Sequence, residues 1–209
     1  MPGQVRRPLE ALAKGAAAVL ARPLEPSELA CFRNYLNLLI KWQKVHRIVG
    51  SADPMWIVEH LFLDSLLFLT LLPPSLRTLV DLGSGAGLPG LPIKIVSREL
   101  EITLVESRRR RAAFLSSAVR ELKLEGAHVV EDRIENLLGD LEGRFQGVVM
   151  RCAGDIGELI PLAARLVESH GVVVAAGPPQ PKPLTLGEWV TVPGVKPGTT
   201  RRFAIYRRP

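Results

Sequence analysis

Cysteine is scarce in this chain, and long uninterrupted apolar runs are missing. Only Cys31 and Cys152 occur among the 209 residues, and neither stands at the spacing of a metal-ligand set. This argues against a disulfide framework or a structural metal site, and it favours a reducing compartment. The apolar run from Leu61 to Leu72 is interrupted by Asp64 and is too short to span a bilayer. We expect a soluble, cytoplasmic protein with no membrane partner and no metal.

Aromatic residues are also few, at 5% of the chain, whereas 47% of the residues are hydrophobic. A chain of this length can bury one substantial core with a smaller appendage. Its net charge of +6 favours a polyanionic partner, although a modest basic excess is also common on solvated surfaces.

The first part of the chain has the pattern of helices. Leu29, Phe32, Leu36 and Leu39 recur at helical spacing and define one apolar face. Asp53-Pro54 predicts the start of a further helix, continuing to about residue 72, because aspartate is a good N-cap and proline suits the first turn. We expect a helical cap over residues 1–76 and a second domain over residues 77–209.

From residue 77 onward, apolar strand-like runs alternate with helical segments. Such alternation predicts an α/β fold with a mostly parallel, seven-stranded, Rossmann-like sheet and helices on both faces. The last two strands are expected to form an antiparallel pair at one edge. Strands are predicted at 78–82, 102–106, 128–131, 146–150, 172–175, 189–192 and 203–206, and helices at 91–99, 109–123 and 155–168.

A glycine-rich loop follows the first predicted strand. The segment from Asp81 to Gly90 reads DLGSGAGLPG, so a buried strand ends in a carboxylate and then glycines recur. Glycine accepts positive φ and lets a ligand lie directly against the backbone. About twenty residues later, Glu106 ends the second apolar run, where an acid can bind the hydroxyls of a ribose. This arrangement is typical of a nucleotide-binding βαβ unit.

Two classes of ligand fit this loop. Residues 85–90 match the dinucleotide pattern GxGxxG, which keeps a nicotinamide or flavin enzyme open, and a purely structural glycine turn is a further alternative. However, Asp81 would repel a pyrophosphate placed beside it. S-adenosyl-L-methionine carries no phosphate and bears a sulfonium and an ammonium group. The loop therefore favours S-adenosyl-L-methionine as the cofactor.

These segments resemble the RsmG (GidB) family, the bacterial 16S ribosomal RNA guanine-N7 methyltransferases, between about residues 35 and 177. The helix containing HLFLDSL at residues 60–66 is similar to the family's histidine and DSL motif. The loop DLGSGAGLPG matches its glycine loop, including the LPG ending. Residues 132–135 and 150–153 resemble its SRxE and SRA turns.

The resemblance implies a class I methyltransferase fold that uses S-adenosyl-L-methionine. The substrate would be a guanine N7 in 16S rRNA, presented as RNA, as the small ribosomal subunit or as an assembly intermediate, and the enzyme would be a monomer. Arg151 would lie beside the methyl-transfer site as the catalytic residue. From the residue pattern and the resemblance together, the expected cofactor-binding residues are Asp81, Gly83, Ser84, Gly85, Gly87, Leu88, Glu106, Ser107, Asp132, Arg133, Ile134 and Glu135.

The chain also departs from the family pattern. Arg47-Ile48-Val49 replaces an Asn-Leu-Thr motif, and Ala176 stands where the family has a lysine. These departures leave open a catalytically impaired RNA-binding protein of the same fold. An NAD(P)-dependent oxidoreductase is a third alternative.

The predicted chemistry needs few groups. The N7 of guanine already offers a lone pair, so positioning and desolvation suffice without a general base. Enzymes that methylate exocyclic amines share an Asn/Asp-Pro-Pro-aromatic turn after the fourth strand, which this chain lacks. Arg151 can contact RNA phosphate or guanine O6 there, or can be an ordinary salt-bridge partner. Cys152 is interpreted as a small buried residue.

Two further clusters have alternative explanations. Arg108 to Arg111 begin a predicted helix, where positive charge opposes the macrodipole. They form either a solvated face or a set of phosphate contacts. His60 and Asp64 lie one helical turn apart, which would suit two metal ligands, but no third ligand is evident. We expect them to form a hydrogen-bonded pair.

Overall fold

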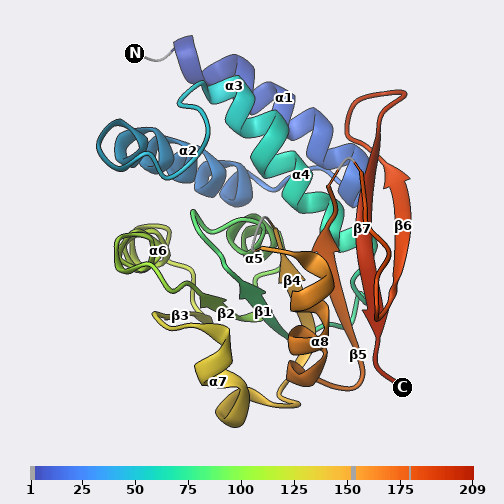
Figure 1. Ribbon diagram of the computed structural model, residues 1–209. Helices are drawn as coiled ribbons and strands as arrows, with labels where there is room; N and C mark the ends of the chain where they lie inside the picture. The colour runs from blue at the N-terminus through green and yellow to red at the C-terminus, as the bar shows by residue number, and fades with distance from the viewer. Residues whose placement is uncertain (1–2, 152–153, 179) are drawn as a thin grey trace.

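The structure is a computed structural model that describes residues 3–151, 154–178 and 180–209, so Cys152 lies outside the described residues. Within these residues no helix combines the length and apolar character needed to cross a membrane. Figure 1 shows a central sheet with helices packed against it. The strands are β1 (Thr78–Leu82), β2 (Glu101–Val105), β3 (Ala127–Val130), β4 (Phe145–Met150), β5 (Val167–Ala176), β6 (Glu188–Pro193) and β7 (Thr200–Arg207). The helical segments are α1 (Gly3–Leu20), α2 (Pro26–His46), α3 (Pro54–Ile57), η1 (Val58–Phe62), α4 (Leu63–Leu66), η2 (Leu67–Thr70), α5 (Gly90–Val96), α6 (Arg109–Glu121), α7 (Ile134–Leu141) and α8 (Ile156–Leu166).

The seven strands form one sheet in the order β3-β2-β1-β4-β5-β7-β6. Strands β1 to β5 pair in parallel, whereas β7 runs antiparallel to both of its neighbours, β5 and β6. The expected mostly parallel, seven-stranded Rossmann-like sheet with an antiparallel edge pair is therefore confirmed. Strand order reverses between β1 and β4, so the topological switch point lies where these two strands end.

Helices cover both faces of the sheet, as expected. Successive side chains of a strand point to opposite faces, so neighbouring residues join different clusters. Leu79 packs in the cluster that includes α1, α2, α5 and α6, whereas Val80 packs with α7 and α8. The N-terminal helices thus share one layer with α5 and α6 (Figure 1). The predicted division at residue 76 stays a prediction.

The helix expected from Asp53 to about residue 72 is interrupted. Asp53 caps it as predicted, because its side chain accepts a hydrogen bond from Trp56 N–H at 2.7 Å. After α3 the backbone changes to a π-helical turn, η1, then to α4 and the 3₁₀ turn η2. A π turn shifts the hydrogen-bond ladder by one residue, and such turns are frequent at functional sites.

Two elements, one helix and one strand, differ clearly from the sequence prediction. Helix α7 was not predicted from the sequence, because it spans eight residues, contains Gly139 and has no side-chain cap at Arg133. Strand β5 begins at Val167, immediately after α8, and not near residue 172. The early part of β5 is irregular, because its register with β4 shifts between Phe145 and Gly147.

Candidate functional site

The site residues lie at one edge of the sheet because three strands end together. Leu82 of β1 is in register with Val105 of β2 and with Met150 of β4. The next residue of each strand, which is Gly83, Glu106 or Arg151, therefore reaches the same carboxyl edge. This edge is at the switch point, where ligands bind in open parallel sheets.

The glycine loop packs closely against Tyr35 of α2 and Leu91 of α5. Gly87 has φ +86°, and a Cβ atom there would lie 2.4 Å from Leu91 Cδ1 and 3.0 Å from Tyr35 Oη. Tyr35 is completely buried, and its hydroxyl donates to the carbonyl of Ala86. Ser84 N–H donates to Val105 O at 3.0 Å, which ties the loop to the neighbouring strand. Glycine is required here because the backbone packs too closely for a side chain.

Asp81 lies beneath this loop and not on its surface. It is completely buried, and its Oδ2 accepts a hydrogen bond from Gly90 N–H, the first residue of α5, at 2.9 Å. Its Oδ1 is buried without a hydrogen-bond partner among the described residues. Burial raises the pKa of Asp81 to about 7, and the hydrogen bond from Gly90 opposes that rise. Asp81 therefore caps the turn that leads into α5, and its contact with the cofactor stays a prediction.

Glu106 joins the end of β2 to the glycine loop. Its side chain is nearly buried, and Oε2 accepts from Gly85 N–H at 3.0 Å while Oε1 accepts from Arg108 N–H at 2.8 Å. Arg111 Nη1 lies 4.0 Å from Oε2. Each carboxylate oxygen has a second lone pair, so Glu106 can still accept hydrogen bonds from a ribose diol.

A cavity of about 190 Å³ opens beside Glu106 at the carboxyl ends of β1 and β2. Its apolar walls, including Leu82, Val105 and Leu159, suit a flat ring such as adenine. Asp132 Oδ1 accepts from Arg133 N–H and from Asn136 Nδ2, both at 2.7 Å, so its carboxylate is fixed at the rim. Six of the predicted cofactor-binding residues line this cavity together: Gly83, Ser107, Asp132, Arg133, Ile134 and Glu135.

Arg151 is paired on the other side of the switch point. Its Nη1 lies 3.3 Å from Asp64 Oδ2, and its Nη2 donates to the carbonyl of His60 in η1 at 2.6 Å. Its side chain is 15% exposed, so these partners compensate a guanidinium that is mostly removed from water. The salt-bridge interpretation is therefore observed, and a catalytic role for Arg151 stays a prediction.

The predicted pair of His60 and Asp64 is wrong. His60 Nδ1 makes its hydrogen bond with Trp56 O at 3.1 Å, and the His60 and Trp56 rings stack with centroids 5.1 Å apart. Asp64 instead faces Arg151 and Arg201, whose Nη2 donates to Asp64 Oδ2 at 2.9 Å. The carbonyl of His60, which lies in the π turn η1, accepts a hydrogen bond from Arg151 instead. In the part of the chain that is described, no group of three or more His, Cys, Asp or Glu could hold a metal ion.

The structure places four residues at this site that the sequence analysis did not assign to it. Tyr35 supports the loop, Arg111 approaches Glu106, Leu159 lines the cavity and Arg201 pairs with Asp64. Arg111 and Arg201 carried only a general signal of basic surface. Tyr35 and Leu159 lie on apolar helical faces, which the sequence pattern marks only as core.

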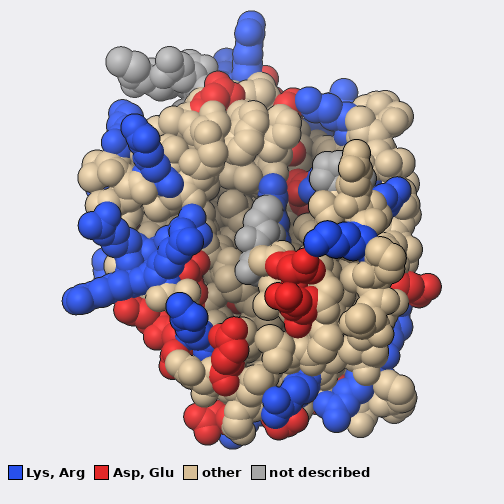
Figure 2. Space-filling view, viewed as in Figure 1, with Lys and Arg blue, Asp and Glu red and all other residues tan. Residues whose placement is uncertain are grey.

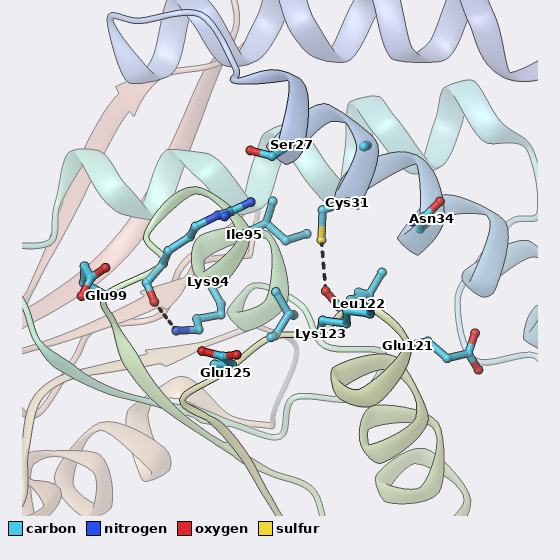
Figure 3. Close-up of a pocket in the computed structure, with 13 residues that line it drawn as sticks. Ser27, Cys31, Asn34, Lys94, Ile95, Glu99, Glu121, Leu122, Lys123 and Glu125 are labelled. Carbon is cyan, nitrogen blue, oxygen red and sulfur yellow. Dashed lines mark hydrogen bonds between the residues drawn. The ribbon is translucent and has the colours of Figure 1, made fainter.

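A larger cavity, of about 640 Å³, lies at the opposite end of the sheet between α2, α5 and the end of α6 (Figure 3). Lys94 Nζ donates to the carbonyl of Leu100 at 2.6 Å and to that of Arg98, so this ammonium is occupied by the loop that follows its own helix. Burial raises the pKa of the Cys31 thiol to about 11, which leaves it protonated at neutral pH. This cavity has neither a glycine loop nor a strand-end carboxylate.

Comparison with known proteins identifies the family. The sequence model of GidB, "rRNA small subunit methyltransferase G", matches residues 28–180. The "Ribosomal RNA small subunit methyltransferase G" of Dichelobacter nodosus is 38% identical, covering 77% of this chain and 74% of that protein. The protein of the same name from Syntrophus aciditrophicus is 34% identical, covering 77% and 68% respectively.

Solved structures agree on the fold. A candidate methyltransferase, yhhF, from Escherichia coli superposes with a TM-score of 0.51 at 19% identity, covering 69% of this chain and 85% of that one. At this identity the likeness shows a Rossmann-like fold and no more. The motif residues at the switch point and the match over residues 28–180 agree, and the chain belongs to the GidB family of rRNA small subunit methyltransferase G.

Proposed function

We propose that this chain transfers the methyl group of S-adenosyl-L-methionine to N7 of a guanine in 16S ribosomal RNA. The observation that carries the proposal is the cavity beside Glu106 at the switch point, in a chain of this family. The methyltransferase names of the relatives support rRNA methylation. Those names specify neither the N7 position nor the cofactor, which are our own proposal.

In this proposal, the cofactor lies across the ends of β1 and β2. Glu106 accepts hydrogen bonds from the ribose hydroxyls, and the backbone of the glycine loop lies against the methionine portion. The adenine ring enters the 190 Å³ cavity, where the carboxylate of Asp132 can accept a hydrogen bond from the adenine amino group. A pyrophosphate is disfavoured, because the acidic residues Asp132 and Glu135 line this cavity.

Methyl transfer to N7 requires no proton abstraction, since the attacking lone pair is unprotonated at neutral pH. The residues therefore act by holding donor and acceptor in line and by excluding water. Arg151 has five N–H donors, and its contacts with Asp64 and His60 leave others for the substrate. We assign to it a hydrogen bond to guanine O6 or to a neighbouring phosphate.

A basic surface beside the loop supports an RNA substrate. Helices α2 and α6 run antiparallel. Trp42, near the end of α2, packs on Phe114, near the start of α6, with ring centroids 5.3 Å apart. Cys31, near the start of α2, approaches the carbonyl of Leu122, just after α6. The end of α2 therefore lies near the start of α6. Figure 2 shows blue side chains gathered over these two helices, on the left. The exposed members are Lys41, Lys44, Arg47, Arg108, Arg109 and Arg110.

The first turn of α6 contains no acidic residue. Its arginines oppose the helix macrodipole, and a bound anion would offset this repulsion. RNA phosphates are suitable anions, and phosphate contacts position a nucleic acid without reading its sequence. Such a substrate also places the protein in the cytoplasm, and a monomer suffices because one chain supplies all the proposed residues.

The test is methyl transfer from tritiated S-adenosyl-L-methionine to 16S rRNA and to small subunits prepared from cells that lack this protein. We expect label in one guanine, which chemical cleavage at N7-methylguanine locates. RNA binding without transfer would favour the catalytically impaired alternative, which the replaced Asn-Leu-Thr and lysine support. Binding of NADH with no binding of S-adenosyl-L-methionine would overturn both proposals.

A further inference from the structure

A second hollow, of about 580 Å³, lies at the same edge of the sheet beyond Arg151. It is bounded by the start of α8, by the loop after β5 and by the two edge strands. No residue of the expected cofactor site belongs to it. The residues that matter here are Ile156 and Gly157 of α8, Ala176 at the end of β5, Pro183 of the loop, Trp189 of β6 and Arg201 of β7.

The two hollows are neighbours on either side of the switch point. Met150 of β4 is in register with Ala175 of β5, so Arg151 lies level with Ala176, which lines the second hollow. Helix α8 contributes to both, because Leu159 lines the 190 Å³ cavity while the first turn of the helix lines the second hollow. A ligand in each would approach the other at the end of β4.

An ion-pair chain links the second hollow to Arg151. Arg201, which lines the hollow, donates from Nη2 to Asp64 Oδ2 at 2.9 Å. The same oxygen lies 3.3 Å from Arg151 Nη1. Asp64 is 10% exposed, so one nearly buried carboxylate holds two arginines that border the space. A group with oxygen or nitrogen acceptors would find two oriented donors here.

The remaining lining combines flat apolar surface with cations. Trp189 packs against Gly177, where a Cβ would lie 2.6 Å from the indole, and its Nε1 donates to Lys182 O at 2.8 Å. Lys182 Nζ in turn reaches Asp155 Oδ2 at 3.3 Å, which fastens the loop across the hollow. An indole, proline and leucine side chains suit the faces of a nucleobase, and the arginine and lysine suit its phosphate.

We propose that this second hollow receives the target guanine, turned out of the RNA, with its ring against Trp189. The inference rests on the proposed function, because it assigns the acceptor to one hollow and the methyl donor to the other. Its volume falls in the range of small-molecule pockets, about 300 to 1,000 Å³. Enzymes that modify a base commonly extrude it into a pocket, and aromatic side chains stack on unpaired bases.

Kinetics of three variants test this assignment. Trp189→Leu removes the flat surface and should raise the KM for RNA about tenfold, the loss expected for one base–aromatic stack, with unchanged affinity for S-adenosyl-L-methionine. Trp189→Phe loses the hydrogen bond to Lys182 but keeps an aromatic plane. Its KM for RNA should therefore stay within about twofold of the wild-type value. The control Tyr206→Leu removes an aromatic ring from β7 outside the hollow and should leave KM unchanged. Equal kinetics for Trp189→Leu and wild type would overturn the inference.

A second measurement does not depend on activity. A 16S rRNA transcript containing 6-thioguanosine is irradiated with the protein, and the cross-linked peptides are identified by mass spectrometry. We expect cross-links within residues 176–189, weakened by Trp189→Leu and retained in Tyr206→Leu. Such cross-links without methyl transfer would support the hollow as a guanine site and contradict the proposed function. Methyl transfer with cross-links confined to other segments would reject the hollow and leave the function standing.

Discussion

The two sides of the switch point are built differently. The donor side takes its polar groups from the continuous stretch 81–135, where each turn directly follows its strand. The acceptor side combines a π turn near residue 60, the end of β4, and residues 176–201 of the loop and edge strands. A local motif therefore specifies the donor side, whereas tertiary topology assembles the acceptor side. Variants on one side should leave the other unaffected, and the following measurements can break that separation.

The largest effect is expected on the donor side from Glu106→Ala. This change removes the proposed ribose contacts and the two observed bonds to backbone amides. We expect the Kd for S-adenosyl-L-methionine to rise about 100-fold, because hydrogen bonds to a charged group contribute about 1.5 to 3 kcal/mol. Calorimetric titration measures this. Glu101→Ala, at the exposed start of the same strand, is the control and should bind normally. Unchanged affinity in Glu106→Ala would refute the placement of the ribose.

On the acceptor side, Arg151→Ala should lower kcat about 30-fold while the Kd for the cofactor stays within about twofold of wild type. The reason is that the hydrogen bonds of Arg151 go to the carbonyls of His60 and Leu61 and its ion pair goes to Asp64, all of which lie outside the glycine loop. Single-turnover methyl transfer and cofactor titration measure the two quantities. Arg165→Ala, which removes an exposed pair with Glu142, is the control. A parallel loss of cofactor binding in Arg151→Ala would show that the two sides are not separable.

We expect the free energy of unfolding to rise as the pH falls, because of Asp81 beneath the glycine loop. Because burial raises the pKa of Asp81 to about 7, the folded protein holds this proton more tightly than the unfolded chain. Its contribution to stability is full below about pH 4 and is lost as the pH rises through 7, so the free energy of unfolding falls by about 2 kcal/mol between pH 5 and 7.

Asp81→Asn should flatten that pH dependence, since the amide is neutral and can still accept from Gly90 N–H. Urea denaturation at several pH values measures it, with the exposed Asp140→Asn as control. An identical slope in Asp81→Asn and wild type would mean that another group is responsible.

The smallest effect is expected at the basic surface beside the glycine loop. Replacing Arg108, Arg109 and Arg110 by alanine should weaken RNA binding about tenfold at 0.15 M salt and reduce the slope of log K against log salt by about 2. Filter binding over a salt series measures both. Arg120→Ala with Lys123→Ala, at the other end of α6, is the matched control. Equal slopes in both variants would reject this surface as the phosphate-binding site.

The sheet and the donor side could be predicted from the sequence, because their signals are local. Apolar runs, the glycine loop and Glu106 define strands and turns within about thirty residues. The position of Arg151 followed from the end of β4. Its partner Asp64 could not be assigned correctly, because spacing on one helix suggested His60. The structure shows instead that Asp64 faces Arg151, which follows β4, and Arg201 of β7, both far from it in the sequence.

The proposed acceptor side could not be predicted from the sequence for a related reason. Trp189 and Arg201 belong to the antiparallel pair β6 and β7, whose pairing places them beside the end of β5, about a hundred residues after the glycine loop. Residues 177–183 are rich in proline, which predicts a stiff loop but gives no indication of what that loop faces. Helix α7 was also missed, although Asp132 to Glu135, at the turn before it and in its first residues, are four of the six predicted cofactor-binding residues at the cavity.

The strut from Tyr35 to the glycine loop has a practical consequence. A phenol on α2 braces the carbonyl of Ala86, so a residue long before the first strand helps to fix the shape of the glycine loop. A fragment trimmed to begin at residue 77 would keep the glycine loop and Glu106 and lose that brace. Anyone grafting this sheet onto a different substrate-recognition module must carry α2 along with it.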